Sequence, residues 1–192
     1  MDSGADANGG TTYLLVDGEN IDATLGTSIL GRRPRPEERP RWDRLLEFAR
    51  DRWAQQPVGL FFLAVNGDLP MSFVQALVAM GYRPVPLAGD GTEKVVDIAI
   101  QRTMAALADR DGDVLLVSND GDFVPGIDRL LEASGRRVGV LGFTEFRNQG
   151  FAPLAGRGLE LLDLEYDVHA FNAVLPRVRI IPIDQFDPLD FL

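Results

Sequence analysis

Short apolar runs alternate along the chain with longer segments in which apolar residues recur at helical spacing. The run at 58–65, VGLFFLAV, is apolar throughout, as expected of a strand that is covered on both faces. Alternation of short strands with helices is typical of a parallel sheet with helices on both faces. We therefore expect an α/β fold with three layers. The expected strands span 12–17, 58–65, 82–87, 113–118 and 137–143, and the expected helices span 42–56, 70–80, 92–109 and 122–134.

Composition limits the chemistry available to the chain. With 192 residues, of which 45% are hydrophobic, the chain can build one sizeable core and one domain. It has no cysteine, which excludes disulfides, thiolate nucleophiles and cysteine-based zinc sites. A single histidine, His169, disfavours histidine-rich metal sites and a serine–histidine relay. The lack of cysteine fits a reducing compartment, and we expect a cytoplasmic protein.

Charge and hydropathy bear on the partners of the chain. The formal net charge is −10, whereas a protein that coats nucleic acid through its phosphates is usually basic. This acidity does not argue against an enzyme whose acidic side chains hold cations. The first eleven residues are small, polar and acidic, unlike a signal peptide, and the apolar runs are too short to span a bilayer. We therefore expect no membrane partner.

The chain is expected to divide into three parts. Residues 1–11 should be disordered, residues 12–165 should form the domain, and residues 166–192 should form a C-terminal extension. Prolines interrupt the extension, so it cannot form a long helix. We expect an edge strand followed by a tail that docks on the domain or on a protein partner. The docking side chains would be Phe186, Leu189 and Phe191.

A second unusual segment lies within the domain. Residues 31–41, GRRPRPEERPR, are rich in proline and arginine and predict a mobile loop. The loop is either a solvated insertion or a basic arm that contacts substrate phosphates. The arm would bind through Arg32, Arg33 and Arg35.

Acidic residues follow two of the expected strands. Asp17 ends the first strand in VDGEN, and Asp120 and Asp122 follow the fourth strand in SNDGDF. Open parallel sheets bind ligands beyond the carboxyl ends of their strands. If the first and fourth strands are neighbours, these distant carboxylates meet and repel one another unless they bind cations or share protons. Sites built from oxygen ligands alone suit Mg²⁺ or Mn²⁺.

Each of these residues also has an ordinary structural explanation. Asp122 could cap the following helix, and Asp120 could stabilise the turn that follows it. Asp17 could belong to a plain strand-end turn, with Asn20 as the cap of the next helix. Glu19 is expected to face solvent or the N-terminus of that helix.

Asp97 interrupts an otherwise apolar helical segment. If Thr92 caps this helix, Asp97 lies beyond the first turn. The helix dipole favours an acid within the first turn and not beyond it. Lys94, Asp97 and Gln101 share one helical face. This face is either a solvent-facing stripe with a local Lys–Asp pair or a surface turned toward the other acids. In the second case, Lys94 would neutralise carboxylates or bind a phosphate.

Three motifs, in order, resemble the signatures of NYN domains, which belong to the PIN-like nuclease superfamily. The motifs are VDGEN at 16–20, EKVVD at 93–97 and SNDGDF at 118–123. The likeness covers most of residues 12–163. It implies a Rossmann-like, PIN-like sheet with acidic residues at the strand ends.

The resemblance also implies a metal-dependent ribonuclease. The residues that would hold Mg²⁺ or Mn²⁺ are Asp17, Asp97, Asp120 and Asp122, supported through hydrogen bonds by Asn20 and Ser118. One cation would lower the pKa of a bound water, and a second would stabilise the leaving oxygen as the phosphodiester is hydrolysed. RNA is the substrate that the resemblance favours.

Other functions can be drawn from the same residues. A Toprim-type site needs a glutamate after the first strand, which Glu19 could supply, but Asp97 would then be unexplained. A phosphatase with an aspartate nucleophile needs a second aspartate where Glu19 stands. The main alternative is a NYN-like scaffold that binds RNA or a protein partner with little turnover. The net negative charge and the proline-interrupted tail favour that alternative.

Overall fold

The fold is built on one six-stranded parallel sheet. The structure, a computed structural model, describes residues 9–192, so most of the expected disorder at 1–11 lies outside the described residues. The strand order is β3-β2-β1-β4-β5-β6, and every neighbouring pair is parallel. The strands are β1 (Thr11–Asp17), β2 (Gln56–Ala64), β3 (Arg83–Leu87), β4 (Asp113–Val117), β5 (Val138–Gly142) and β6 (Glu160–Asp163).

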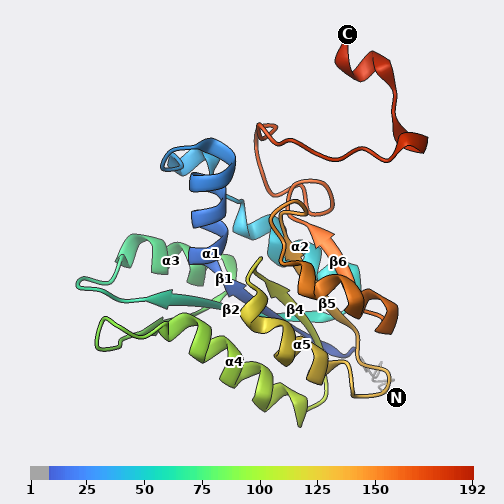
Figure 1. Cartoon of the computed structure of the whole chain (residues 1–192). Coiled ribbons are helices and arrows are strands. Elements are labelled where there is room, and N and C mark those ends of the chain that lie inside the picture. Colours follow the sequence, from blue (N-terminus) through green and yellow to red (C-terminus); the bar gives the residue numbers. More distant parts are fainter. Residues whose placement is uncertain (1–8) are drawn as a thin grey trace, which may run out of the picture.

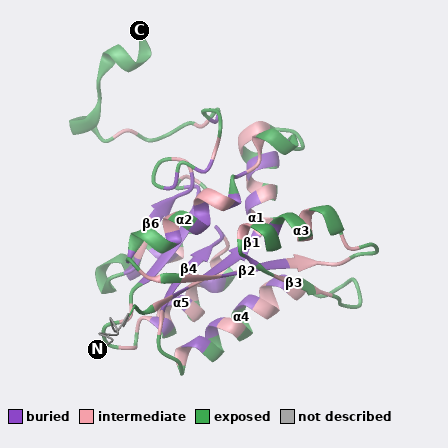
Figure 2. Cartoon of the chain, turned by 180° about the vertical axis from the view of Figure 1, so that it is seen from behind, coloured by how far each residue is buried: buried purple, intermediate pink, exposed green. Residues whose placement is uncertain are grey.

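Helices cover both faces of the sheet, as Figure 1 shows. One face carries α1 (Gly18–Ala23), α2 (Trp42–Arg52) and α3 (Met71–Met80), and the other carries α4 (Val95–Ala108) and α5 (Val124–Leu130). Alternate residues of β1 enter different cores: Leu14 and Val16 pack with the first set of helices, and Leu15 packs with the second. The central strands β1, β4 and β5 are the most deeply buried elements (Figure 2). The predicted α/β fold with three layers is therefore confirmed.

Two elements were not expected from the sequence. The chain after β1 forms α1, capped by Asp17 where Asn20 was the expected cap, and continues directly as a π-helical segment, Thr24–Leu30, which was not expected. Strand β6 precedes Tyr166, whereas the edge strand was expected after it. The expected position was wrong because β6 has only four residues, too few to show a periodicity of their own.

The proline- and arginine-rich segment, expected to be a mobile loop, carries ion pairs to itself and to α1. It follows the α1 helix and contains a short 3-10 helix, Pro36–Glu38. Arg32 forms a two-point ion pair with Glu38, at 2.5 and 2.7 Å, which lowers the pKa of Glu38 to about 2. Arg39 pairs with Asp22 at 3.0 Å. The segment is thereby fastened to itself and to α1.

The C-terminal extension packs on the domain only as far as Arg177. The guanidinium of Arg177 is buried and forms ion pairs with Glu145, Asp163 and Glu165. Beyond it the chain leads away from the domain (Figure 1). Docking of the tail on the domain or on a partner stays a prediction. The side chains expected to dock are exposed: Phe186 by 49%, Leu189 by 76% and Phe191 by 62%.

The expectation that the protein has no membrane partner can be compared with the length and hydropathy of the helices. Within residues 9–192, none of them is long and apolar enough to cross a bilayer.

Candidate functional site

The site begins where two neighbouring strands end. Strand β1 pairs with β4, and Val16 lies opposite Val117, so the residues that follow them stand side by side. The Ser118 hydroxyl donates a hydrogen bond of 2.9 Å to the Asp17 carboxylate. The Asn20 backbone N–H donates to the other carboxylate oxygen at 3.3 Å, so Asp17 is also the N-cap of α1. Asp17 therefore caps a helix and also belongs to the site.

Asp17 is nearly inaccessible to solvent, with 2% of its surface exposed. This burial raises the pKa of Asp17 to about 6, although the hydrogen bonds from Ser118 and Asn20 act in the opposite direction. The charges of Asp97 and Glu19 add to the increase. The carboxylate is thus held in place at a cost in free energy that a nearby cation would reduce.

Three further carboxylates converge near Asp17. One oxygen from each of Asp97, Asp120 and Asp122 lies within 4.8 Å of the other two. Asp120 also accepts a hydrogen bond of 2.9 Å from the Asp122 backbone N–H, which caps the 3-10 turn Gly121–Phe123. We refer to Asp97, Asp120 and Asp122 as the acid cluster.

Asp97 lies in the first turn of α4, because this helix starts later than expected. The helix begins at Val95 with Lys94 as its N-cap, so Asp97 belongs to the first turn. A helix capped by Thr92 would have placed Asp97 beyond that turn. Its side chain is 18% exposed. Burial, followed by the charge of Asp120, raises its pKa. The Asp97 side chain therefore faces the other acids, and the helical face that carries it is not purely a solvent-facing stripe.

Lys94 supplies the positive charge of the cluster. Its ammonium group lies 3.4 Å from an oxygen of Asp122 and 3.6 Å from an oxygen of Asp97. The hydrogen bond to Asp122 and the charges of the three acids raise the pKa of Lys94. Its side chain remains 72% exposed. The local Lys–Asp pair and the contact with the cluster are both present.

A cleft of about 410 Å³ opens over these residues. Asp17 lines it together with Asp97, Asp120 and Lys94, whereas Asp122 lies outside its wall. Glu19 is exposed in the first turn of α1, as expected, and it also lines the cleft and accepts a hydrogen bond of 3.2 Å from the Ala64 backbone N–H. The other lining residues are Asn20, Ala64, Asn66, Gly89, Gly91, Glu93, Val95 and Val96.

Asn119 holds the loop that carries the acid cluster, a role that the sequence did not reveal. Its buried side chain accepts from the Phe143 backbone N–H at 2.8 Å and donates to Asn20 and Thr24 at 3.3 Å. The Asn20 side chain in turn accepts from the Asn119 backbone N–H at 2.9 Å. Asn20 therefore acts through Asn119, while only its backbone contacts an acid. A polar residue directly after a buried strand was the available signal.

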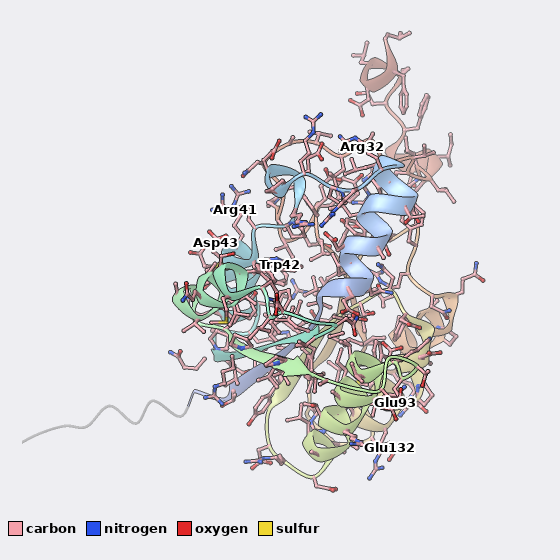
Figure 3. All side chains as sticks on the ribbon, turned by 90° about the vertical axis from the view of Figure 1, so that its left-hand side faces the viewer. Arg32, Arg41, Trp42, Asp43, Glu93 and Glu132 are labelled. Carbon is pink, nitrogen blue, oxygen red and sulfur yellow. The ribbon has the colours of Figure 1, made fainter. Side chains whose placement is uncertain are left out.

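The three arginines of the proposed arm lie elsewhere. None of Arg32, Arg33 and Arg35 lines the cleft. Arg32 lies just beyond the π-helical segment Thr24–Leu30, at its end remote from the sheet, whereas Glu93 lies beside α4 (Figure 3). Arg33 and Arg35 form no ion pair within residues 9–192.

Comparisons with known proteins agree with this geometry. A protein of unknown function from Vibrio parahaemolyticus has a similar structure, with a TM-score of 0.65 and 19% sequence identity over 87% of this chain and 98% of that one. At this identity the likeness concerns the fold alone. No curated protein matches the chain. The family model of the NYN domain matches residues 11–154, which include all three motifs. The chain therefore belongs to the NYN domain family, within the PIN-like nuclease superfamily.

Proposed function

We propose that this protein is a metal-dependent ribonuclease that hydrolyses RNA phosphodiester bonds. The observation that carries the proposal is the acid cluster, whose oxygens lie within 4.8 Å of one another beside the cleft of a NYN domain. Carboxylates this close repel one another, so the arrangement favours a bound cation. Membership of a nuclease superfamily favours phosphodiester hydrolysis as the reaction, and RNA as the substrate.

The donor atoms fit Mg²⁺ or Mn²⁺. All candidate ligands are carboxylate oxygens, which hard divalent cations prefer, and neither cysteine nor histidine is near. Asp97, Asp120 and Asp122 would hold the ion, with Asp17 as a fourth carboxylate on the floor of the cleft. When bound, such an ion supplies an acidified water and a positive charge for the leaving oxygen.

The remaining residues position these acids and the substrate. Ser118 fixes one oxygen of Asp17, and Asn20 fixes Asn119 and thereby the loop of Asp120. The Lys94 ammonium group stands at the end of an exposed side chain, so it can turn from the carboxylates to a phosphate oxygen. It would then offset the negative charge that the acids present to RNA.

The arginine arm would contact longer RNAs outside the cleft. Arg33 and Arg35 carry free positive charge, while Arg32 is engaged by Glu38. Replacement of Arg32, Arg33 and Arg35 with alanine should weaken RNA binding and reduce its salt dependence, because fewer counterions are released. Equal affinity in wild type and variant would make the segment a structural insertion only.

The function is tested with labelled single-stranded and hairpin RNAs, incubated with Mn²⁺ or with a chelator. We expect cleavage with Mn²⁺ only, and loss of cleavage in Asp97→Asn, which keeps the shape of the side chain but removes its charge. Asp109→Asn is the matched control, because Asp109 lies exposed at the other end of α4. RNA binding without any cleavage by the wild type would favour a scaffold function.

A further inference from the structure

The acid cluster separates two hollows of the surface. Asp97, Asp120 and Lys94 line the cleft described above. Asp122 instead lines a groove of about 380 Å³ between α4 and α5. Since one oxygen of Asp122 lies within 4.8 Å of oxygens of Asp97 and Asp120, the cleft and the groove adjoin at the cluster. The groove is lined by Gln101, Met104, Ala105, Asp122, Pro125, Gly126 and Arg129.

The floor of the groove is apolar and kept open by a glycine. A side chain at Gly126 would come within 2.6 Å of the Met104 methyl group, so a larger residue would push into the groove or displace Met104. Pro125 and Ala105 complete an apolar surface. Such a surface suits the face of a nucleobase, which is apolar, while the phosphate and sugar remain in solvent.

The rim of the groove provides polar groups. The Gln101 side-chain amide lies 3.4 Å from the Asp122 carbonyl oxygen and can donate to a ligand with its second N–H. Arg129 is exposed and has no ion-pair partner within residues 9–192, while the adjacent Asp128 pairs with Arg157. A free guanidinium at this rim is suited to a phosphate, which it can bind through two N–H groups.

We propose that this groove binds the nucleotide next to the bond that is cut, with its base on Ala105 and Pro125 and its phosphate on Arg129. The proposal rests on the proposed ribonuclease function. Lys94 in the cleft and Arg129 in the groove then place one positive charge on either side of the acid cluster. An RNA strand would pass through the cleft, over the cluster and along the groove. RNA on this path would continue on both sides of the acid cluster and would be cut internally.

Arg129→Ala tests the phosphate contact, with Arg50→Ala as its control. Arg50 is also exposed and forms no ion pair with any of residues 9–192, but it lies on α2, on the opposite face of the sheet. Affinity for a short single-stranded RNA is measured against salt concentration, with Asp97→Asn added to prevent cleavage. We expect Arg129→Ala to weaken binding several-fold and to lower the salt slope by about 1, as for the loss of one phosphate contact. Equal effects of the two alanine variants would overturn the subsite.

A second pair of variants tests the groove without changing charge. Ala105 and Ala106 are neighbouring, exposed residues of α4, but only Ala105 lines the groove. Ala105→Trp should fill the groove and raise the KM for RNA cleavage, whereas Ala106→Trp should behave as wild type. Equal kinetics for both variants would contradict the proposal, and matching thermal unfolding would show that both fold.

A closed circular RNA tests the internal cut. We expect the wild type with Mn²⁺ to linearise the circle, which has no end to enter from. Cleavage of linear RNA alone would overturn the continuous path. If no RNA is cut under any condition, the ribonuclease function fails, and the binding comparison of Arg129→Ala with Arg50→Ala still decides whether the groove binds RNA.

Discussion

The Ser118 hydroxyl donates a 2.9 Å hydrogen bond to the Asp17 carboxylate, which joins residues that are 101 positions apart in the sequence. This bond connects the ends of two central strands and is buried. It holds an acid where water cannot solvate it. The metal-free site is therefore under electrostatic strain, which has a measurable effect on stability.

The raised pKa of Asp17 predicts a pH dependence of stability in the metal-free protein. The folded state binds this proton more tightly than the unfolded chain, because the pKa rises from an ordinary 3.8 to about 6. Binding of this proton to Asp17 therefore stabilises the folded state fully below about pH 4, and this stabilisation is lost as the pH rises through about 6. The change of about 2 pKa units sets an upper limit of about 3 kcal/mol.

Asp17→Asn should remove this dependence. Denaturant unfolding with a chelator present, between pH 4 and pH 8, should show wild type losing free energy of unfolding relative to Asp17→Asn as the pH rises. Asp109→Asn serves as the control and should follow wild type. A constant difference between wild type and Asp17→Asn across this range would show that Asp17 does not titrate there.

Asn119 is predicted to stabilise the loop of the acid cluster. Asn119→Ala leaves the buried Phe143 backbone N–H without its acceptor and removes one of the two hydrogen bonds to the Asn20 side chain, which should lower the free energy of unfolding by about 2 kcal/mol or more. Asn148 is exposed and makes one local hydrogen bond, so Asn148→Ala should cost about 1 kcal/mol or less. Equal losses in the two variants would argue against this role.

The acids of the site could be predicted from sequence because they occupy positions that topology brings together. An acid at the end of a strand stays there when the strand boundary shifts by a residue, as happened at β1 and β4. Asp97 could be recognised because it interrupts an apolar helix. These signals are local and survive errors in the boundaries of elements.

The other features depend on contacts that a single sequence does not display. The helix after Asp17 contains Gly26 and several threonines, which weaken its helical pattern, yet burial of Ile21 and Leu25 stabilises it. The pairing of Arg32 with Glu38 and the hydrogen bonds of Asn119 depend on the folded backbone. The sequence therefore indicated that the arm is charged, but it did not indicate that Arg32 is paired with Glu38.

The folded unit is predicted to end at Arg177, beyond the matched family region at 11–154. Burial alone would raise the pKa of Asp163, but hydrogen bonds from Arg177 and Thr144 hold this pKa below its usual range. Arg177→Met would leave Asp163 and its neighbouring acids buried without a counter-charge. It should cost about 3–5 kcal/mol of unfolding free energy.

Truncation after Arg177 is the matched comparison for that variant. It removes residues 178–192, whose apolar side chains are mostly exposed, so the midpoint of thermal unfolding should change by less than that of Arg177→Met. A large loss on truncation would show that the tail packs on the domain in solution. Both variants are compared by thermal unfolding monitored with circular dichroism.

The central claim is that the acid cluster binds a divalent cation, and calorimetric titration with Mn²⁺ tests it most directly. We predict saturable binding to wild type and to Asp109→Asn, and loss of that binding in Asp120→Asn, whose amide can still cap the turn at Asp122. Thermal unfolding of wild type should shift upward with Mn²⁺, since the ion binds only the folded state. Equal Mn²⁺ binding by wild type and Asp120→Asn, or none by either at millimolar Mn²⁺, would contradict the account.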